Sequence, residues 1–341
     1  MQPFEFSRTG DLQSAYLAYR AAAAEETSAA HSGSEYLAGG TTLLDLMKLG
    51  VIRPERVVDI NDLDRTNAGR IEFAGTRLRL GALARMSTVA DHPDVRRDFP
   101  VIAQSLQLAA SAQIRNMASL GGNVLQRTRC SYFRDITYAN CNKREPGSGC
   151  AALDGINRPH AVLGTSDRCI ATYPGDFAQA LIALDAEVEV MGRNGPREFP
   201  FAKLHRQPGE TPHLETTLVP GELIIAFHVT RAPFARRSLF LKVRDRESYE
   251  FALASAAVAL DLNGETVKQA RIALGGVATV PWRAHEAEAS LINQRLDETA
   301  TRHAADLAFA DARPREHNAF KVELGKRTLM RALHQAGAME I

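Results

Sequence analysis

The sequence has little cysteine, almost no net charge and no long apolar run. Four of its 341 residues are cysteine, and 45% hydrophobic with 24% charged residues is an ordinary composition for a globular chain. A chain of this length can bury enough apolar surface to fold without disulfides. Its formal charge of +1 provides no field that would attract nucleic acid or an anionic membrane. We therefore expect a small-molecule cofactor or protein partners, and neither nucleic acid nor membrane.

The first residues lack the pattern of an export signal. Residues 1–20 contain no basic segment followed by an apolar core, and nowhere does an apolar run approach the roughly 18 residues of a membrane span. The one low-complexity stretch is an alanine run at residues 21–24, at the end of an expected first helix. We expect a chain without an export signal of its own.

Hydrophobic periodicity predicts α and β structure together in the first two thirds of the chain. Apolar residues alternate on both sides of a turn within residues 71–80, which predicts a β-hairpin, and residues 102–111 have helical spacing. Asp176 is placed to cap a helix that reaches residue 184, and residues 188–190 then alternate as in a strand.

A domain boundary is predicted near residue 222. Three prolines and two glycines fall within residues 208–221, between periodic segments. Strand-like runs follow, and a helical pattern ends the chain at residues 320–333. We therefore divide the chain into domains 1–222 and 223–341.

Two Gly-Gly pairs lie among small polar residues, in LAGGTTLLD (37–45) and IRNMASLGGN (114–123). Either pair alone is most simply a turn before a helix. Two such loops in one domain favour a pair of loops that clasp a pyrophosphate, because glycine lets the backbone approach a ligand closely. Neither stretch has the G-x-G-x-x-G spacing of a Rossmann site.

All four cysteines fall within 40 positions, with the spacing C-x10-C-x8-C-x18-C. Two disulfides, a four-cysteine zinc site and an iron–sulfur cluster are all compatible with this group, as are idle thiols in a solvated loop. Zinc sites usually use close C-x2-4-C pairs, which are absent here. Residues 126–150 hold five basic and two acidic side chains, a net +3 that suits thiolates around an anionic centre. These observations favour the cluster.

Together these stretches resemble the flavoprotein subunit of molybdenum-containing hydroxylases, a family that includes xanthine dehydrogenase, carbon monoxide dehydrogenase and aldehyde oxidoreductases. LAGGTTLLDLMK and IRNMASLGGNVLQ look like its two FAD-pyrophosphate loops, and the similarity continues through CIATYPGDFAQALIALDA and LKVRDRESYEFALASAAVAL. The cysteine insertion, about residues 126–170, is similar to that of the FAD subunit of bacterial periplasmic aromatic aldehyde oxidoreductase, where such a loop carries a [4Fe–4S] cluster.

The resemblance implies contacts for each cofactor. The first loop would wrap the FAD diphosphate, Asp176 would contact the ribityl or adenosine portion, and Lys242 would lie near the isoalloxazine ring. The implied FAD residues are Glu35, Tyr36, Leu37, Ala38, Gly39, Gly40, Thr41, Thr42, Leu43, Ser119, Gly122, Asn123, Asp176 and Lys242. The implied ligands of the [4Fe–4S] cluster are Cys130, Cys141, Cys150 and Cys169.

The fold implied by the resemblance is α+β. An FAD-binding domain of two α/β subdomains would be followed by a smaller C-terminal domain with a three-stranded antiparallel sheet and helices. The chain would transfer electrons from a [2Fe–2S] small subunit to an external acceptor. Aldehyde oxidation would occur in a molybdopterin-binding large subunit of the same heterotrimer, so no catalytic residue is expected here.

Alternative functions remain open from the sequence. One is the flavoprotein subunit of a 4-hydroxybenzoyl-CoA reductase-like enzyme, and another is a subunit whose cysteine loop is a purely structural cluster or zinc site. We expect a periplasmic location through co-export with a partner that bears a signal, with the cytoplasm as the alternative. Tyr132, Phe133 and Tyr138 are expected to be exposed and to contact a partner subunit.

Overall fold

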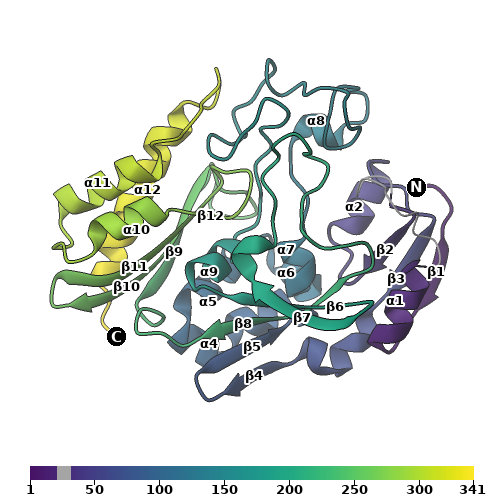
Figure 1. The fold of residues 1–341 in the computed structure, drawn as a ribbon, viewed down its shortest axis with the longest axis horizontal. Helices are drawn as coiled ribbons and strands as arrows, with labels where there is room; N and C mark the ends of the chain where they lie inside the picture. The colour runs from purple at the N-terminus through teal and green to yellow at the C-terminus, as the bar shows by residue number, and fades with distance from the viewer. Residues whose placement is uncertain (21–31) are drawn as a thin grey trace.

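The computed structural model describes residues 1–20 and 32–341, and the alanine run at residues 21–24 lies outside them. Three sheets and the helices that cover them make up the fold, and the segment around the short helix α8 (Ser131–Arg134) extends away from the sheets at the top of the view (Figure 1). The mixed α and β fold agrees with the α+β prediction. Within the described residues, no helix is both long and apolar enough to span a membrane.

The first subdomain is built on a parallel sheet of three strands, with β3 in the centre. Val57 and Val58 of the central strand β3 are buried. Parallel strands cannot be joined by a tight turn, so a crossover segment connects each strand to the next. The elements are β1 (Glu5–Arg8), α1 (Leu12–Arg20), β2 (Ser34–Leu37), α2 (Leu43–Lys48) and β3 (Arg56–Asp59). The turn from β2 into α2 is the first glycine loop.

The second subdomain has a five-stranded antiparallel sheet in the order β4-β5-β8-β6-β7. The predicted hairpin is present, with Gly75 at a φ of +59° in its turn. The strands are β4 (Ile71–Ala74), β5 (Arg77–Gly81), β6 (Glu187–Gly192), β7 (Gly195–Pro200) and β8 (Leu223–Thr230). Because β8 pairs with both β5 and β6, it belongs to this sheet, and the change to the next sheet comes after Thr230 rather than near residue 222.

Short helices surround this sheet and share its apolar core, in which Phe99, Phe177 and Phe227 are almost fully buried. The α-helices are α3 (Met86–Asp91), α4 (Pro93–Asp98), α5 (Pro100–Gln107), α6 (Ala112–Met117), α7 (Leu120–Val124) and α9 (Phe177–Ala183). Short 3-10 turns lie at η1 (Asn61–Arg65), η2 (Asn67–Gly69) and η3 (Phe201–Lys203). The second glycine loop, residues 114–123, includes the end of α6 and most of α7, and Gly121 and Gly122 lie in α7.

The C-terminal domain has an antiparallel sheet in the order β12-β11-β10-β9, with α12 packed against β9 and β10. We predicted three strands, and the fourth, β12, is an edge strand of two residues that is too short for a periodic pattern. The elements are β9 (Ser238–Val243), β10 (Ala254–Asn263), β11 (Thr266–Gly275), β12 (Trp282–Arg283), α10 (His285–Leu291), α11 (Glu298–Ala308) and α12 (Phe320–Gly337).

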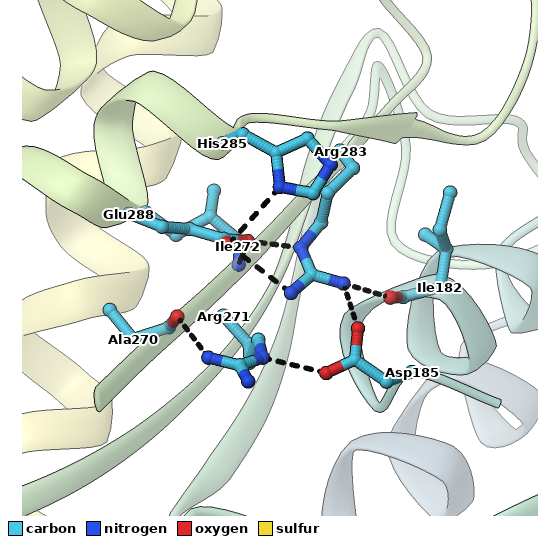
Figure 2. A network of polar contacts seen from close by, with 8 residues as sticks. All are labelled: Ile182, Asp185, Ala270, Arg271, Ile272, Arg283, His285 and Glu288. Carbon is cyan, nitrogen blue, oxygen red and sulfur yellow. Dashed lines mark hydrogen bonds and ion pairs between the residues drawn. The ribbon is translucent and has the colours of Figure 1, made fainter. Parts of the chain in front are cut away.

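A network of ion pairs joins the two domains where the end of α9 meets β11 and β12 (Figure 2). Asp185 accepts from Arg271 Nε at 2.8 Å and from Arg283 Nη1 at 2.7 Å, and Arg283 also pairs with Glu288. Burial alone would raise the pKa of Asp185, but the two arginines outweigh it and hold that pKa below its usual value. These contacts fix the C-terminal sheet against the FAD-binding domain.

Candidate functional site

The two glycine loops meet at one cavity of about 420 Å³. A Cβ built on Gly39 would lie 2.1 Å from the carbonyl oxygen of Met117, so the backbones of the two loops are in direct contact there. Only glycine permits that approach. The sequence prediction that these distant stretches act together is thus matched by their position in the fold.

Local interactions shape each loop. Gly40 has a φ of +72°, and α2 begins at Leu43 after the N-cap residue Thr42, whose side chain makes no capping hydrogen bond. In the second loop the Ser119 hydroxyl caps α7 by accepting from Gly122 N at 3.2 Å. The Thr42 hydroxyl therefore does not cap α2, whereas the Ser119 hydroxyl is occupied by its hydrogen bond to the backbone of α7.

Arg85 and Asn61, which belong to no sequence motif, join the two loops by hydrogen bonds. Arg85 donates to the Met117 carbonyl at 2.6 Å and to Asn61 Oδ1 at 3.0 Å. Asn61 Nδ2 in turn donates to the carbonyl of Ala38 at 3.0 Å. This chain of hydrogen bonds holds the first loop against the second.

Ten of the fourteen predicted FAD residues line the cavity, and four do not. Those that line it are Glu35, Tyr36, Ala38, Gly39, Gly40, Thr41, Thr42, Leu43, Ser119 and Gly122. Those outside its lining are Leu37, Asn123, Asp176 and Lys242. Leu37 packs against the apolar cluster around the cysteines, and Asn123 Nδ2 lies 3.4 Å from Met86 Sδ.

Asp176 and Lys242 form a buried ion pair with 2.7 Å between Oδ2 and Nζ. Lys242 Nζ also donates to the Leu108 carbonyl at 3.1 Å. Asp176 stands at the N-cap of α9 as expected, but its side chain pairs with Lys242 and makes no capping hydrogen bond. Burial raises the pKa of Asp176, against the opposing effects of Lys242 and Arg244. The contacts of Asp176 and Lys242 with the flavin stay predictions.

Another part of the cavity wall comes from residues 171–174 and from residues within 205–224, none of which was predicted to contact FAD. Glu215 lies there between two cations: Lys143 Nζ is 2.7 Å from its Oε1, and Arg127 pairs with its Oε2. Burial alone would raise the pKa of Glu215, but Arg127 and Lys143 hold it below its usual value. In the sequence, the prolines, glycines and polar side chains of residues 208–221 indicate only a break between periodic segments.

Glu35 lies in the cavity wall, and burial raises its pKa to about 7 from an ordinary 4.5, with Arg127 opposing the rise. The folded chain therefore keeps a proton that the unfolded chain releases above about pH 4.5, so Glu35 costs stability as pH rises toward 7. We expect Glu35→Gln to be increasingly more stable than the unsubstituted chain between pH 5 and 8 in flavin-free thermal unfolding. Parallel pH curves for the two proteins would contradict this expectation.

The four cysteines gather in a second site beside the first subdomain. Cys130 immediately precedes α8, and Cys141 and Cys150 face each other across an isolated antiparallel bridge. All four share one apolar cluster. Burial raises the pKa of Cys130 to about 12 and that of Cys169 to about 11, so neither thiol ionises readily without a cation or metal beside it.

The state and surroundings of the four cysteine thiols bear on the disulfide, zinc and iron–sulfur alternatives. All four cysteines are free, so the two-disulfide alternative is not formed. Within the described residues, no group of three or more Cys, His, Asp or Glu side chains could hold a single metal ion. Zinc bonds of about 2.3 Å would require sulfurs only about 3.8 Å apart. Cys130, Cys141 and Cys169 are buried and Cys150 is partly buried, and all four pack in the same apolar cluster.

The basic residues of this loop serve mostly to hold its shape. Arg134 Nη1 is 2.8 Å from Asp45 Oδ2, and Arg144 Nη1 donates to the carbonyls of Tyr132 at 2.9 Å and Phe133 at 2.7 Å. The loop's net charge of +3 is therefore not a set of free cations around the thiols. Lys143 lowers the pKa of Cys169, where burial is the larger, opposing effect.

Two of the three aromatic residues in this loop are not exposed, which corrects the prediction. Phe133 is 1% exposed and Tyr132 is buried, and both pack in the apolar cluster of the cysteines. Tyr138 alone is exposed, at 44%, with its ring 4.8 Å from that of Tyr132. The aromatic residues cover the cysteines from within the chain, since burying them there removes apolar surface from water.

The fold and the flavin cavity define a class of protein. The family model of the FAD binding domain in molybdopterin dehydrogenase matches residues 4–231, and that of the CO dehydrogenase flavoprotein C-terminal domain matches residues 240–336. The chain belongs to this family of FAD-binding flavoproteins, as the resemblance of its glycine loops predicted.

Individual relatives narrow the class further. The aldehyde oxidoreductase FAD-binding subunit PaoB of Escherichia coli (strain K12) is 46% identical over 307 residues, which are 90% of this chain and 92% of the relative. The carbon monoxide dehydrogenase medium chain of Hydrogenophaga pseudoflava is 26% identical over 90% of each chain. A solved carbon monoxide dehydrogenase from that organism matches 99% of each chain with a TM-score of 0.75 at 25% identity.

Proposed function

We propose that the chain is the FAD-binding electron-transfer subunit of a molybdenum-dependent aldehyde oxidoreductase. It would work in a heterotrimer with a [2Fe–2S] small subunit and a molybdopterin-binding large subunit, and would pass electrons to an external acceptor. The observation that carries the proposal is the cavity between two glycine loops that touch through their backbones at Gly39. The 46% identity to an aldehyde oxidoreductase FAD-binding subunit supports the substrate class.

The residues of the cavity suit a dinucleotide. FAD, when bound, supplies the redox chemistry, and the protein supplies position and electrostatics. The glycine loops bring backbone N–H groups close to where a diphosphate would lie, and Thr41 and Thr42 add hydroxyls on the same wall. Neither glycine loop, residues 37–45 or 114–123, contains a cysteine, histidine or tyrosine to which a flavin could be attached, which favours noncovalent binding.

We propose further that Cys130, Cys141, Cys150 and Cys169 ligate a [4Fe–4S] cluster. Their gathering in one buried apolar cluster, without disulfides, supports a shared occupant. His160 Nε2 lies 3.1 Å from Cys130 Sγ and is suited to hold that sulfur in place. Export in the folded state with a partner that bears a signal, and hence a periplasmic location, is part of the same proposal.

Purification of the native complex tests the flavin and the partners together. We expect this chain to co-elute with two partner chains, to release one FAD on acid precipitation, and to oxidise aromatic aldehydes as part of the complex. Recovery of FMN, or of no flavin from an assembled complex, would overturn the flavin assignment. An assembled complex that reduces a thioester substrate with a low-potential electron donor, and does not oxidise aldehydes, would overturn the proposed direction of electron transfer.

Metal analysis of Cys150→Ser tests the cluster. We expect about four iron atoms per chain beyond those of the [2Fe–2S] partner, and loss of most of that iron in the variant, because one ligand of four is removed. Ser131→Ala, which changes an exposed residue next to Cys130, is the matched control and should keep native iron. Zinc in place of iron, or full iron in Cys150→Ser, would refute the assignment.

A further inference from the structure

The wall of the flavin cavity and the cysteine loop share one ion-paired group. Arg127, Glu215 and Lys143 all line the cavity, and Glu215 bridges the two cations. Lys143 belongs to the cysteine loop, between Cys141 and Cys150, whereas Glu215 belongs to the wall segment 205–224. We name Arg127, Glu215 and Lys143 the bridge.

The bridge is anchored on both sides. On the side of the cavity wall, Lys143 Nζ also donates to the Pro212 carbonyl at 3.0 Å. On the side of the cysteines, the Arg127 guanidinium stacks over the ring of Phe133 at 4.9 Å, and Phe133 is packed among the cysteines. The three side chains of the bridge are largely buried, with 12% to 20% of each exposed.

The burial of these ion pairs determines how much free energy is lost when one of them is broken. A paired charge that loses its partner in a buried position is left without solvation, so breaking such a pair costs far more than breaking an exposed one. A second ion pair joins the same two segments at the surface, with 2.9 Å between Arg168 Nε and Glu210 Oε2. Its side chains are 56% and 80% exposed, so this pair supplies a matched comparison.

We propose that the bridge couples order in the cysteine loop to retention of FAD. The inference rests on the proposed binding of FAD in this cavity. A loop that is ordered around its cysteines holds Lys143 in place, Lys143 holds Glu215, and the wall segment stays closed on the flavin. Because coupling between two sites is reciprocal, FAD in the cavity stabilises the cysteine loop to the same extent.

The test is FAD binding and hydrogen exchange in the assembled complex carrying Lys143→Met. This variant removes the contacts of Lys143 with Glu215 and the Pro212 carbonyl and leaves the Arg127–Glu215 pair intact, so folding should be retained. We expect the dissociation constant of FAD to rise at least tenfold. Amides of residues 131–149 should be protected by added FAD in the unsubstituted complex and should lose most of that FAD-dependent protection in the variant.

Glu215→Gln and Glu210→Gln form the matched comparison, because they make the same change in the same segment. Glu215→Gln should weaken FAD binding at least as much as Lys143→Met, while Glu210→Gln should change it less than twofold. Equal FAD affinity in folded Lys143→Met and unsubstituted complexes, or loop protection that does not respond to FAD, would overturn the coupling. An unsubstituted complex that binds no FAD would instead overturn the proposed function.

Discussion

Replacing Gly39 with alanine should weaken FAD binding roughly a hundredfold, about 2.7 kcal/mol of binding free energy. The added Cβ would lie 2.1 Å from the Met117 carbonyl oxygen and 3.0 Å from Ala118 Cα, both of which are backbone atoms. Backbone cannot turn aside as a side chain can, so the two glycine loops must separate. Their separation would widen the cavity where the diphosphate is expected. Flavin fluorescence titration of the Gly39→Ala complex measures the effect.

Gly10→Ala is the control for this substitution. Gly10 is exposed, and a Cβ there would meet no atom within 4 Å. It should bind FAD with unchanged affinity, and circular dichroism of both variants should match the unsubstituted protein. A folded Gly39→Ala protein with native FAD affinity would show that contact between the loops is not needed for the site.

Replacing Phe133 with alanine should lower the free energy of unfolding by about 3 to 5 kcal/mol, as truncation of a buried phenylalanine generally does. Phe133 is 1% exposed, packs among the cysteines and supports the Arg127 guanidinium on its ring. The cavity left by the ring would loosen the loop around all four thiols. Denaturant unfolding of the isolated chain, read by circular dichroism, measures the loss.

Tyr138→Ala serves as the comparison, because its ring is 44% exposed and lies in the same loop. It should cost less than about 1 kcal/mol, as surface substitutions usually do. If the aromatic residues of this loop instead anchor a partner subunit, Tyr138→Ala would release the partner while Phe133→Ala left the stability of the chain unchanged. Co-elution with the partner chains separates these results.

Local pattern predicted several elements of this fold, but not all of their pairing. The hairpin of β4 and β5 followed from alternation around a glycine turn, and α12 followed from helical spacing. The position of β8 between β5 and β6 did not, because no local periodicity records which distant strand is a partner. The predicted domain boundary near residue 222 lies directly before β8 in the chain.

The site residues that belong to a sequence motif could be selected from the sequence. The glycine loops and the cysteines stand out in the sequence, and the structure brings each group together. The wall around Glu215 carries no motif, since its function depends on Arg127 and Lys143, which come from other segments. Asp176 and Lys242 were assigned to the flavin by resemblance, and their mutual pairing depends on contact between α9 and β9, which sequence spacing does not reveal.

The central place of β8 sets an order of events during synthesis. The ribosome delivers β5 early, then the whole cysteine segment, then β6 and β7, and only then the strand that joins them. Until residues 223–230 emerge, β5 and β6 have unpaired edges, and contacts so distant along the chain form slowly. The wall at residues 205–224 emerges just ahead of that strand. A nascent chain therefore has no finished flavin cavity, and cofactor loading follows translation of the greater part of the protein.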